Sequence, residues 1–229
     1  MPAVGQMASP RSWAFAILGM SCFSQGVSID SNVQQLYAIT AKRLKLFFEA
    51  SENEQWPWPE PILTYDNARL PQALMLAGQD LGDQQMIATG LRCLDWLAEL
   101  QIGRDGVVGL VSHEGWTAGA APRPIYDQQP VEAAAMVEAC ATAYRITQDA
   151  KWFEWAKQFH LWFLGNNAMS LPLRDASTGG CADGLQAGGV NFNQGAESTL
   201  ALLSSSLTIR DLYRRAVEST TSLERDAVA

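Results

Sequence analysis

The sequence predicts an all-α fold in which helical hairpins follow one another around a ring, an (α/α) toroid. Apolar residues recur at helical spacing through most of the chain, and almost no segment has the period of a β-strand. Turns of two or three residues alternate with loops of roughly 25 residues, and loops of that length are usually functional. In such a ring, the long loops gather over one mouth. An ordinary helical bundle is the alternative.

The N-terminal part is predicted to contain two helices and an extended loop. Pro10 suits a first helical turn, and the apolar run 11–23 then forms a core helix. The next helix spans 30–50, because Asp30 is a typical capping residue and large apolar residues recur every three or four positions after it. Three prolines within 57–61 remove backbone donors, so this aromatic segment is an extended loop.

The rest of the chain is predicted to form two further hairpins and a last helix. Gly82-Asp83 and Gln148-Asp149 are turn signals that separate the two helices of each hairpin. Residues 102–125 and 166–194 are Gly-rich loops, with a short strand expected at 107–111. The helices are expected at 68–81, 84–101, 130–147, 150–165 and 195–216, which gives seven or eight in the whole chain.

The composition is that of a globular, acidic protein. Hydrophobic residues make up 48% of the chain, charged residues make up 17%, and the formal net charge is −8. Such a chain has no basic surplus to neutralise phosphates, which argues against a nucleic-acid partner. The length suffices for one core, so we expect a single domain over 1–216 and a polar, frayed tail over 217–229.

The cysteines and the apolar segments bear on the compartment. The four cysteines lie far apart and match no metal or CxxC spacing, so we expect reduced thiols in a cytoplasmic protein, with two disulfides as the alternative. The apolar run 13–23 is too short to span a bilayer and lacks a clear cleavage site. A buried helix is therefore expected there, and no membrane span.

A repeated string places polar side chains at two helix starts. Tyr-Asp-Asn and Tyr-Asp-Gln each stand shortly before a proline, which is tolerated only in the first helical turn. Asp66 with Asn67, and Asp127 with Gln128, therefore lie at or before a helix start. Capping is the structural interpretation of the two aspartates, and it is compatible with binding a ligand hydroxyl or anion. A weaker copy at 191–197 opens the last helix.

Glu132 and Glu197 follow these strings, one turn into their helices. A glutamate there stabilises a helix through the macrodipole or completes a capping box. The functional interpretation is a carboxylate that faces the centre of the ring, because glycosidic chemistry uses a pair of carboxylates.

Other residues match the needs of a carbohydrate. Trp56, Trp58 and Trp116 lie in predicted loops, where burial in a core is a weaker explanation, and sugars pack their C–H faces on flat aromatic rings. His113 also lies in a loop and is a site candidate, whereas His160 lies on a helix among aromatic residues and is predicted to be packed. The chain has no GxGxxG, P-loop, GxSxG or HExxH motif and no Cys/His cluster, so we expect neither a cofactor nor a metal.

Several short motifs together resemble a bacterial family. They are Trp-Pro-Trp-Pro-Glu at 56–60, Leu-Thr-Tyr-Asp-Asn-Ala-Arg-Leu-Pro-Gln-Ala-Leu at 63–74, Glu-Gly-Trp at 114–116, Tyr-Asp-Gln-Gln-Pro-Val-Glu-Ala at 126–133, Thr-Gly-Gly-Cys-Ala-Asp-Gly-Leu at 178–185 and Asn-Gln-Gly-Ala-Glu-Ser-Thr-Leu-Ala at 193–201. Over about 11–207 the chain is similar to six-hairpin-glycosidase-like domains that are fused to, or encoded beside, family 4 type glycosyltransferases. The resemblance implies an (α/α) toroid and a carbohydrate context, without a settled reaction. A ring of six hairpins contains twelve helices, so this ring is expected to be partial or open.

These observations predict a carbohydrate-active or glycan-binding domain, with glycoside hydrolase-like acid/base chemistry if it is catalytic. A non-catalytic scaffold or interaction module of a glycosyltransferase is one alternative. A sugar epimerase or isomerase is the other, although that chemistry usually uses two histidines. The expected partners are a glycan, a glycosyltransferase domain or protein, and a second copy at the open ring edge. The candidate catalytic residues are Glu132, Glu197, Asp127, Asp66 and Asp183. The candidate substrate-binding residues are Trp56, Trp58, Asn67, Arg69, His113, Trp116, Gln128, Gln129, Asn193 and Gln194.

Overall fold

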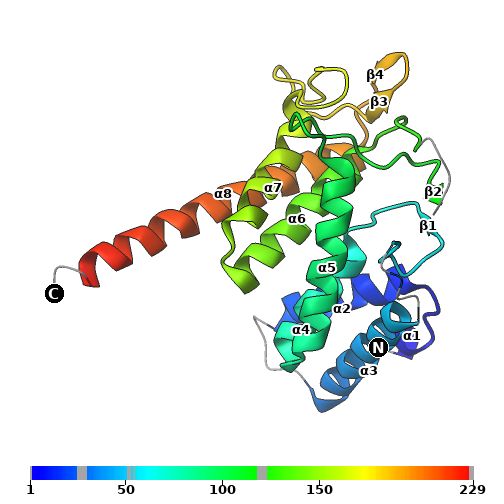
Figure 1. The fold of residues 1–229 in the computed structure, drawn as a ribbon, viewed down its shortest axis with the longest axis vertical. Coiled ribbons are helices and arrows are strands. Elements are labelled where there is room, and N and C mark those ends of the chain that lie inside the picture. The colour runs from blue at the N-terminus through cyan, green and yellow to red at the C-terminus, as the bar shows by residue number, and fades with distance from the viewer. Residues whose placement is uncertain (1, 25–29, 51–52, 54, 118–122, 227–229) are drawn as a thin grey trace.

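Helices carry the fold, as the sequence predicts. The computed structural model describes residues 2–24, 30–50, 53, 55–117 and 123–226. Within these ranges, a four-residue helix α1 (Pro2–Gly5) precedes seven helices of 12 to 31 residues. They are α2 (Pro10–Ser24), α3 (Ser31–Glu49), α4 (Arg69–Leu81), α5 (Gln84–Gln101), α6 (Pro130–Thr147), α7 (Ala150–Leu161) and α8 (Ala196–Asp226), with a 3-10 turn η1 (Trp162–Leu164) after α7 (Figure 1). None of the described helices is long and apolar enough to cross a membrane.

Alternate helices form an inner row. Helix α4 packs against α2 on one side and α6 on the other, and α6 packs against α8. The helices between them cover the outside, because α3 packs on α2, α5 on α4 and α7 on α6. This is the arrangement of an (α/α) toroid, and the inner row ends at α8.

Local signals close the hairpins where the sequence places the turns. Gly82 ends α4 in the left-handed region at φ 73°, and the Asp83 side chain accepts the first free N–H groups of α5. The next hairpin repeats this, since Gln148 is left-handed at φ 57° and Asp149 caps α7. These turns explain why the predicted helix boundaries agree closely with the structure.

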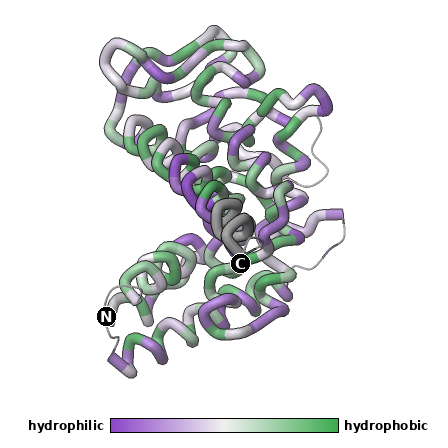
Figure 2. Tube along the Cα trace, turned by 90° about the vertical axis from the view of Figure 1, so that its left-hand side faces the viewer, coloured by the Kyte–Doolittle hydropathy of each residue, from purple (hydrophilic) through white to green (hydrophobic). Residues whose placement is uncertain are grey.

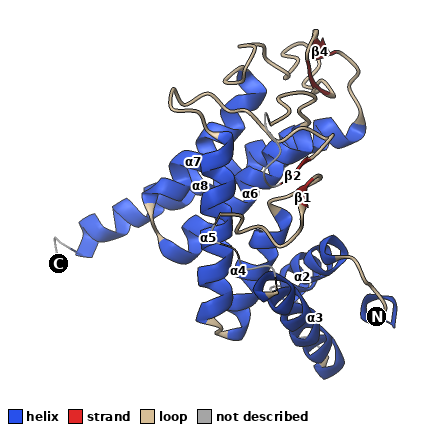
Figure 3. Ribbon diagram, turned by 45° about the vertical axis from the view of Figure 1, so that its right-hand side comes forward, coloured by secondary structure: helices blue, strands red, loops and turns tan. Residues whose placement is uncertain are grey.

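The long loops gather at one end of the helices, where the short strands also lie (Figure 3). Strand β1 (Ile62–Leu63) pairs with β2 (Trp116–Thr117), which joins the loops before α4 and α6. Strands β3 (Gly184–Gln186) and β4 (Gly189–Asn191) form a hairpin in the loop before α8. The loops that precede three inner helices therefore meet over the N-terminal ends of those helices.

The strand predicted at 107–111 does not form, although its apolar residues are buried. Val108 makes only isolated bridges, to Ile102 and Asn167. The N–H groups of Leu110 and Val111 donate to the side-chain oxygens of two glutamines, at 3.1 and 3.0 Å. Buried amides thus replace the strand partner that the sequence pattern implied.

Helix α8 is longer than predicted. It continues past 216 to Asp226 and projects beyond the other helices (Figure 1), because no glycine or proline interrupts 196–226. Residues 227–229 of the predicted frayed tail lie outside the described part. Hydrophobic and hydrophilic residues intermingle along this helix (Figure 2), and Leu200, Leu203 and Leu207 are 64, 48 and 53% exposed. They share one face at helical spacing, which we call the α8 stripe.

Candidate functional site

A pocket of about 170 Å³ lies where α6 begins, against the β3–β4 hairpin. Five residues proposed from the sequence line it, although they come from two separate loops. The lining consists of these five, His113, Asp127, Gln128, Gln129 and Asp183, together with Gly184, Gln186 and Asn191. The structure therefore brings together five of the fifteen predicted site residues, and we call this pocket the mouth pocket.

Gln128 builds the wall of the mouth pocket. Its side-chain oxygen accepts the indole N–H of Trp162 at 2.8 Å and the N–H of Leu110 at 3.1 Å. Its backbone exchanges two hydrogen bonds with Leu185 at 2.9 Å, which ties the β3–β4 hairpin to the start of α6. Gly184 permits this approach, because a Cβ there would lie 2.8 Å from the Gln128 carbonyl oxygen. The amide is thus occupied by structural hydrogen bonds.

Asp127 is the least engaged carboxylate of the mouth pocket. The side chain is half-buried, and Oδ2 accepts a long hydrogen bond of 3.4 Å from the Gln186 amide. The Asp127 backbone carbonyl accepts the N–H of His113 at 3.0 Å, which places the histidine beside it. Asp127 does not cap α6, whose N-cap is Gln129 without a side-chain hydrogen bond. Its carboxylate therefore has capacity for a ligand.

Asp183 is held by the start of α8. Its Oδ1 accepts the N–H of Gly195 and the hydroxyl of Ser198, both at 2.7 Å, and Asn193 donates to Oδ2. The Ser198 hydroxyl, the Gly195 N–H and the Asn193 amide all favour the charged form and keep the pKa of Asp183 below its ordinary value. Asp183 thus contributes an ionised carboxylate to the pocket lining. Its hydrogen bond from the Asn193 amide fixes the position of Asn193.

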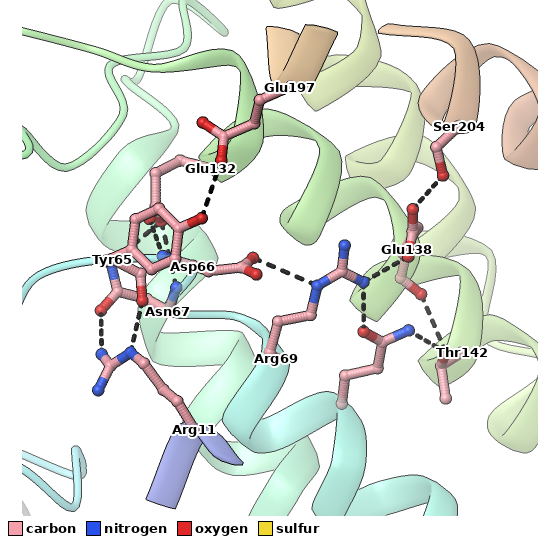
Figure 4. A network of polar contacts seen from close by, with 11 residues as sticks. Arg11, Tyr65, Asp66, Asn67, Arg69, Glu132, Glu138, Thr142, Glu197 and Ser204 are labelled. Atoms are coloured by element: carbon pink, nitrogen blue, oxygen red, sulfur yellow. Dashed lines mark hydrogen bonds and ion pairs between the residues drawn. The ribbon is translucent and has the colours of Figure 1, made fainter. Parts of the chain in front are cut away.

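Glu132 is buried and closes the start of a neighbouring inner helix. The side chain is 3% exposed and accepts the N–H of Asp66, the N–H of Asn67 at 3.3 Å and the Asn67 amide at 3.0 Å (Figure 4). Burial raises the pKa of Glu132 to about 7, with help from the charge of Asp66, while these hydrogen bonds oppose the shift. Glu132 on α6 therefore stabilises the start of α4 from across the inner row, by accepting hydrogen bonds from Asp66 and Asn67.

Asp66 does not cap its own helix. The N-cap of α4 is Ala68, without a side-chain hydrogen bond. Asp66 instead adopts φ 48°, and its Oδ1 accepts from Arg69 Nε at 3.2 Å. Burial raises the pKa of Asp66 to about 6, while the Arg69 charge lowers it. The aspartate of the first repeat is thus an internal partner of Arg69.

Arg69 is the centre of a polar seam along the inner faces of α4, α6 and α8 (Figure 4). It donates to Gln72 at 3.0 Å and also pairs with Glu138, which accepts from Ser204. The sequence prediction did not include Glu138 or Ser204. In the sequence, both are polar residues on otherwise apolar helix faces. This pattern can be interpreted only when the positions of the neighbouring helices are known.

Glu197 lies at the same end of the inner row and is exposed. Its Oε2 accepts the hydroxyl of Tyr65 at 3.1 Å, so the third copy of the repeat contacts the first (Figure 4). Partial burial and the Glu197 charge raise the pKa of Tyr65 to about 12. Tyr65 was not among the predicted site residues, although it opens the repeated string.

The tryptophans proposed for sugar stacking lie in or against the core. Trp58 is fully buried and Trp56 is 9% exposed. Trp56 packs on Trp96 and on the half-buried Trp116, with ring centroids 5.1 and 5.2 Å apart. The indole N–H groups of Trp56 and Trp58 donate to backbone carbonyls of the same loop. The Pro-rich loop folds back onto α5 and β2, so none of these rings lines the mouth pocket.

The candidate Gln194 and the second histidine, His160, have structural partners. Gln194 is exposed, donates to Asp175 at 3.0 Å and accepts from Thr178 at 3.2 Å, which ties the 175–194 loop together. His160 packs near Phe163 and its Nδ1 lies 2.8 Å from the Ser205 hydroxyl, as predicted for a packed histidine. Within the described part of the chain, no three His, Cys, Asp or Glu side chains are grouped to hold a metal ion. The four cysteines are free.

Comparison with known proteins identifies the fold. No protein-family model and no curated protein sequence matches the chain. An inactive variant of an α-1,6-mannanase, GH76A, from a Salegentibacter species in complex with α-1,6-mannotriose is 14% identical with a TM-score of 0.63, over 87% of this chain and 54% of that one. A GH76 α-mannanase of Bacteroides thetaiotaomicron is 14% identical with a TM-score of 0.61, over 88% and 56%.

An unsaturated glucuronyl hydrolase from a Bacillus species, responsible for degradation of glycosaminoglycan, is 14% identical with a TM-score of 0.63, over 86% and 54%. The predicted (α/α) toroid is confirmed, and it is the fold of six-hairpin glycosidases. The chain spans about half the length of these structures.

Proposed function

We propose that this domain binds a glycan in the mouth pocket and acts on it through carboxylate chemistry. The observation that carries the proposal is the convergence of Asp127, Gln129 and Asp183 on one pocket at the N-terminal end of an inner helix. Carboxylate and amide groups are what sugar hydroxyls need as hydrogen-bond partners. The neighbours of the same fold support the proposal, since one binds α-1,6-mannotriose and another is a glucuronyl hydrolase.

Asp127 is the residue to which we assign a reacting role. Glycoside hydrolysis uses one carboxyl group to protonate the leaving oxygen and another to activate water or stabilise positive charge. Asp127 makes one long hydrogen bond and Glu197 accepts one from Tyr65, so both retain acceptor capacity. Asp183 accepts three hydrogen bonds and suits a role in holding positive charge.

Glu132 and Asp66 are assigned positioning roles. Both are 3% exposed and hold the start of α4 and the polar seam. The inactive mannanase variant carries Asp-to-Asn changes at two consecutive positions. This chain contains no two adjacent aspartates, and an amide follows both Asp66 and Asp127. We therefore place its reacting carboxylates at separate positions in the chain.

The test compares turnover with affinity. Asp127→Asn is expected to abolish release of reducing sugar from a panel of oligosaccharides while binding persists. Glu99→Gln, which makes the same charge change at an exposed position on α5, is the control and retains full turnover. If the unaltered protein binds oligosaccharides but never cleaves one, the domain is a binding module and the catalytic part is refuted.

We propose that two copies of the chain associate through the α8 stripe at the open edge of the ring. The proposal rests on Leu200, Leu203 and Leu207, which are exposed on one face of α8. Leu203→Glu is expected to convert a dimer to a monomer in light scattering. An unaltered protein that is monomeric at high concentration refutes this proposal.

We also propose a cytoplasmic location, on the basis of the free cysteines, and a functional association with a glycosyltransferase. The association rests on the sequence resemblance. A coding sequence for such an enzyme beside this one would support it, and failure of the two purified proteins to bind would argue against a complex.

A further inference from the structure

We infer that the mouth pocket takes an uncharged or amino-bearing sugar unit and disfavours units that carry carboxylate, sulfate or phosphate groups. The inference rests on the proposed function, because it concerns the ligand of the same pocket. It goes further by naming the charge class of that ligand, which the fold does not decide. Proteins of this fold include mannanases and a glucuronyl hydrolase.

The lining of the pocket is acidic. Asp127 and Asp183 contribute two carboxylates, and the described residues that line the pocket include no lysine or arginine. His113 is the one lining group that could carry positive charge, and it is exposed. Hydrogen bonds hold Asp183 in its charged form, so at least one negative charge in the wall is fixed.

Three arginines of the neighbouring loops and helix starts serve other groups. Arg69 is paired with Asp66 and Glu138 in the polar seam. Arg11 donates to Tyr65 O and Asn67 Oδ1 at the start of α4.

Arg123 precedes Asp127 in the same loop, but it is half-buried and donates to the Gly109 carbonyl at 3.0 Å. None of these three arginines belongs to the lining. An anionic ligand would therefore lose its hydration beside two carboxylates without gaining a lysine or arginine partner from the lining.

A neutral or amino sugar finds hydrogen-bond partners in the same lining. Its hydroxyl or ammonium groups can donate to the Asp127 carboxylate, which accepts one long hydrogen bond of 3.4 Å from Gln186. Gln129, Gln186 and Asn191 provide amide groups in the same lining, and amides both donate to and accept from hydroxyls. The lining is thus complementary to hydroxyl-rich or cationic ligands.

The experiment measures binding of three trisaccharides by calorimetry at low salt: α-1,6-mannotriose, a glucosamine trimer and a galacturonate trimer. We expect saturable binding of the neutral or amino trimer, and affinity for the galacturonate trimer weaker by about tenfold or more. Gln186→Arg is expected to strengthen galacturonate binding by about tenfold, because it places a guanidinium in the lining. Gln85→Arg, an exposed position at the start of α5, is the charge-matched control and leaves all three affinities unchanged.

The outcomes separate the two proposals. If the galacturonate trimer binds the unaltered protein as tightly as the other two, or more tightly, the inference about charge is overturned and the proposed function stands. A Gln186→Arg variant without improved galacturonate binding also counts against the inference. If no trimer of any class binds, the proposed glycan-binding function itself fails.

Discussion

Replacing Glu132 by glutamine tests whether burial or hydrogen bonding has the larger effect on the pKa of this carboxyl group. Glu132 is 3% exposed, and burial raises its pKa from 4.5 to about 7. The native state then binds a proton more tightly than the unfolded chain does, so the free energy of unfolding falls as pH rises from about 4.5 to about 7. A shift of this size corresponds to roughly 3 kcal/mol, at 1.36 kcal/mol for each pKa unit.

Glutamine resembles the protonated glutamate and does not titrate. The loss of stability between pH 5 and pH 8 should therefore be smaller in Glu132→Gln than in the unaltered protein, by about 2–3 kcal/mol. Urea unfolding followed by tryptophan fluorescence measures both values, and Glu99→Gln at an exposed position is the control. If the variant instead loses stability relative to the unaltered protein as pH rises, the three donors from Asp66 and Asn67 outweigh burial, and the reasoning is refuted.

Three further substitutions test individual contacts. Gly184→Ala is expected to weaken sugar binding about tenfold or more, because its Cβ would lie 2.8 Å from the Gln128 carbonyl oxygen and push the β3–β4 hairpin away; unchanged affinity in a titration would contradict this. Arg69→Met is expected to lower the free energy of unfolding by about 3–5 kcal/mol, since two largely buried carboxylates lose their cation; a loss below about 1 kcal/mol in urea unfolding would argue against the seam. Asp183→Ala should cost about 1–2 kcal/mol and speed amide hydrogen exchange in the first turn of α8, and unaltered exchange there would show that Asp183 does not hold the helix start.

The helices could be predicted from the sequence because their signals are local. Apolar periodicity marks the buried faces, while Gly82 with Asp83 and Asp149 mark the turns within a few residues of the helices they end or begin. The α8 boundary was predicted too early, because the polar residues after 216 continue the helix in the absence of glycine or proline. The frayed state of the tail over 217–229 stays a prediction.

The site was only partly predictable, because its geometry depends on contacts between distant segments. Asp127 and Asp183 line one pocket because Gln128 pairs with Leu185. No local sequence pattern predicts that pairing. The side-chain direction of Glu132 depends in the same way on the position of α4.

Trp58 illustrates the opposite error. Its place in a Pro-rich loop suggested exposure, whereas the loop folds inward and buries the ring completely. Sequence reasoning thus located the polar groups at the helix starts, but it could not tell which of them remain available to a ligand.

A crystal structure with a bound oligosaccharide would show whether the mouth pocket holds the sugar. We expect a sugar ring with hydroxyl or amino groups within hydrogen-bond distance of Asp127, Gln129 and Gln186. A sugar bound instead in the larger pocket between α4, α6 and α8, beside Gln79 and Arg145, with the mouth pocket empty at saturating ligand, would contradict it.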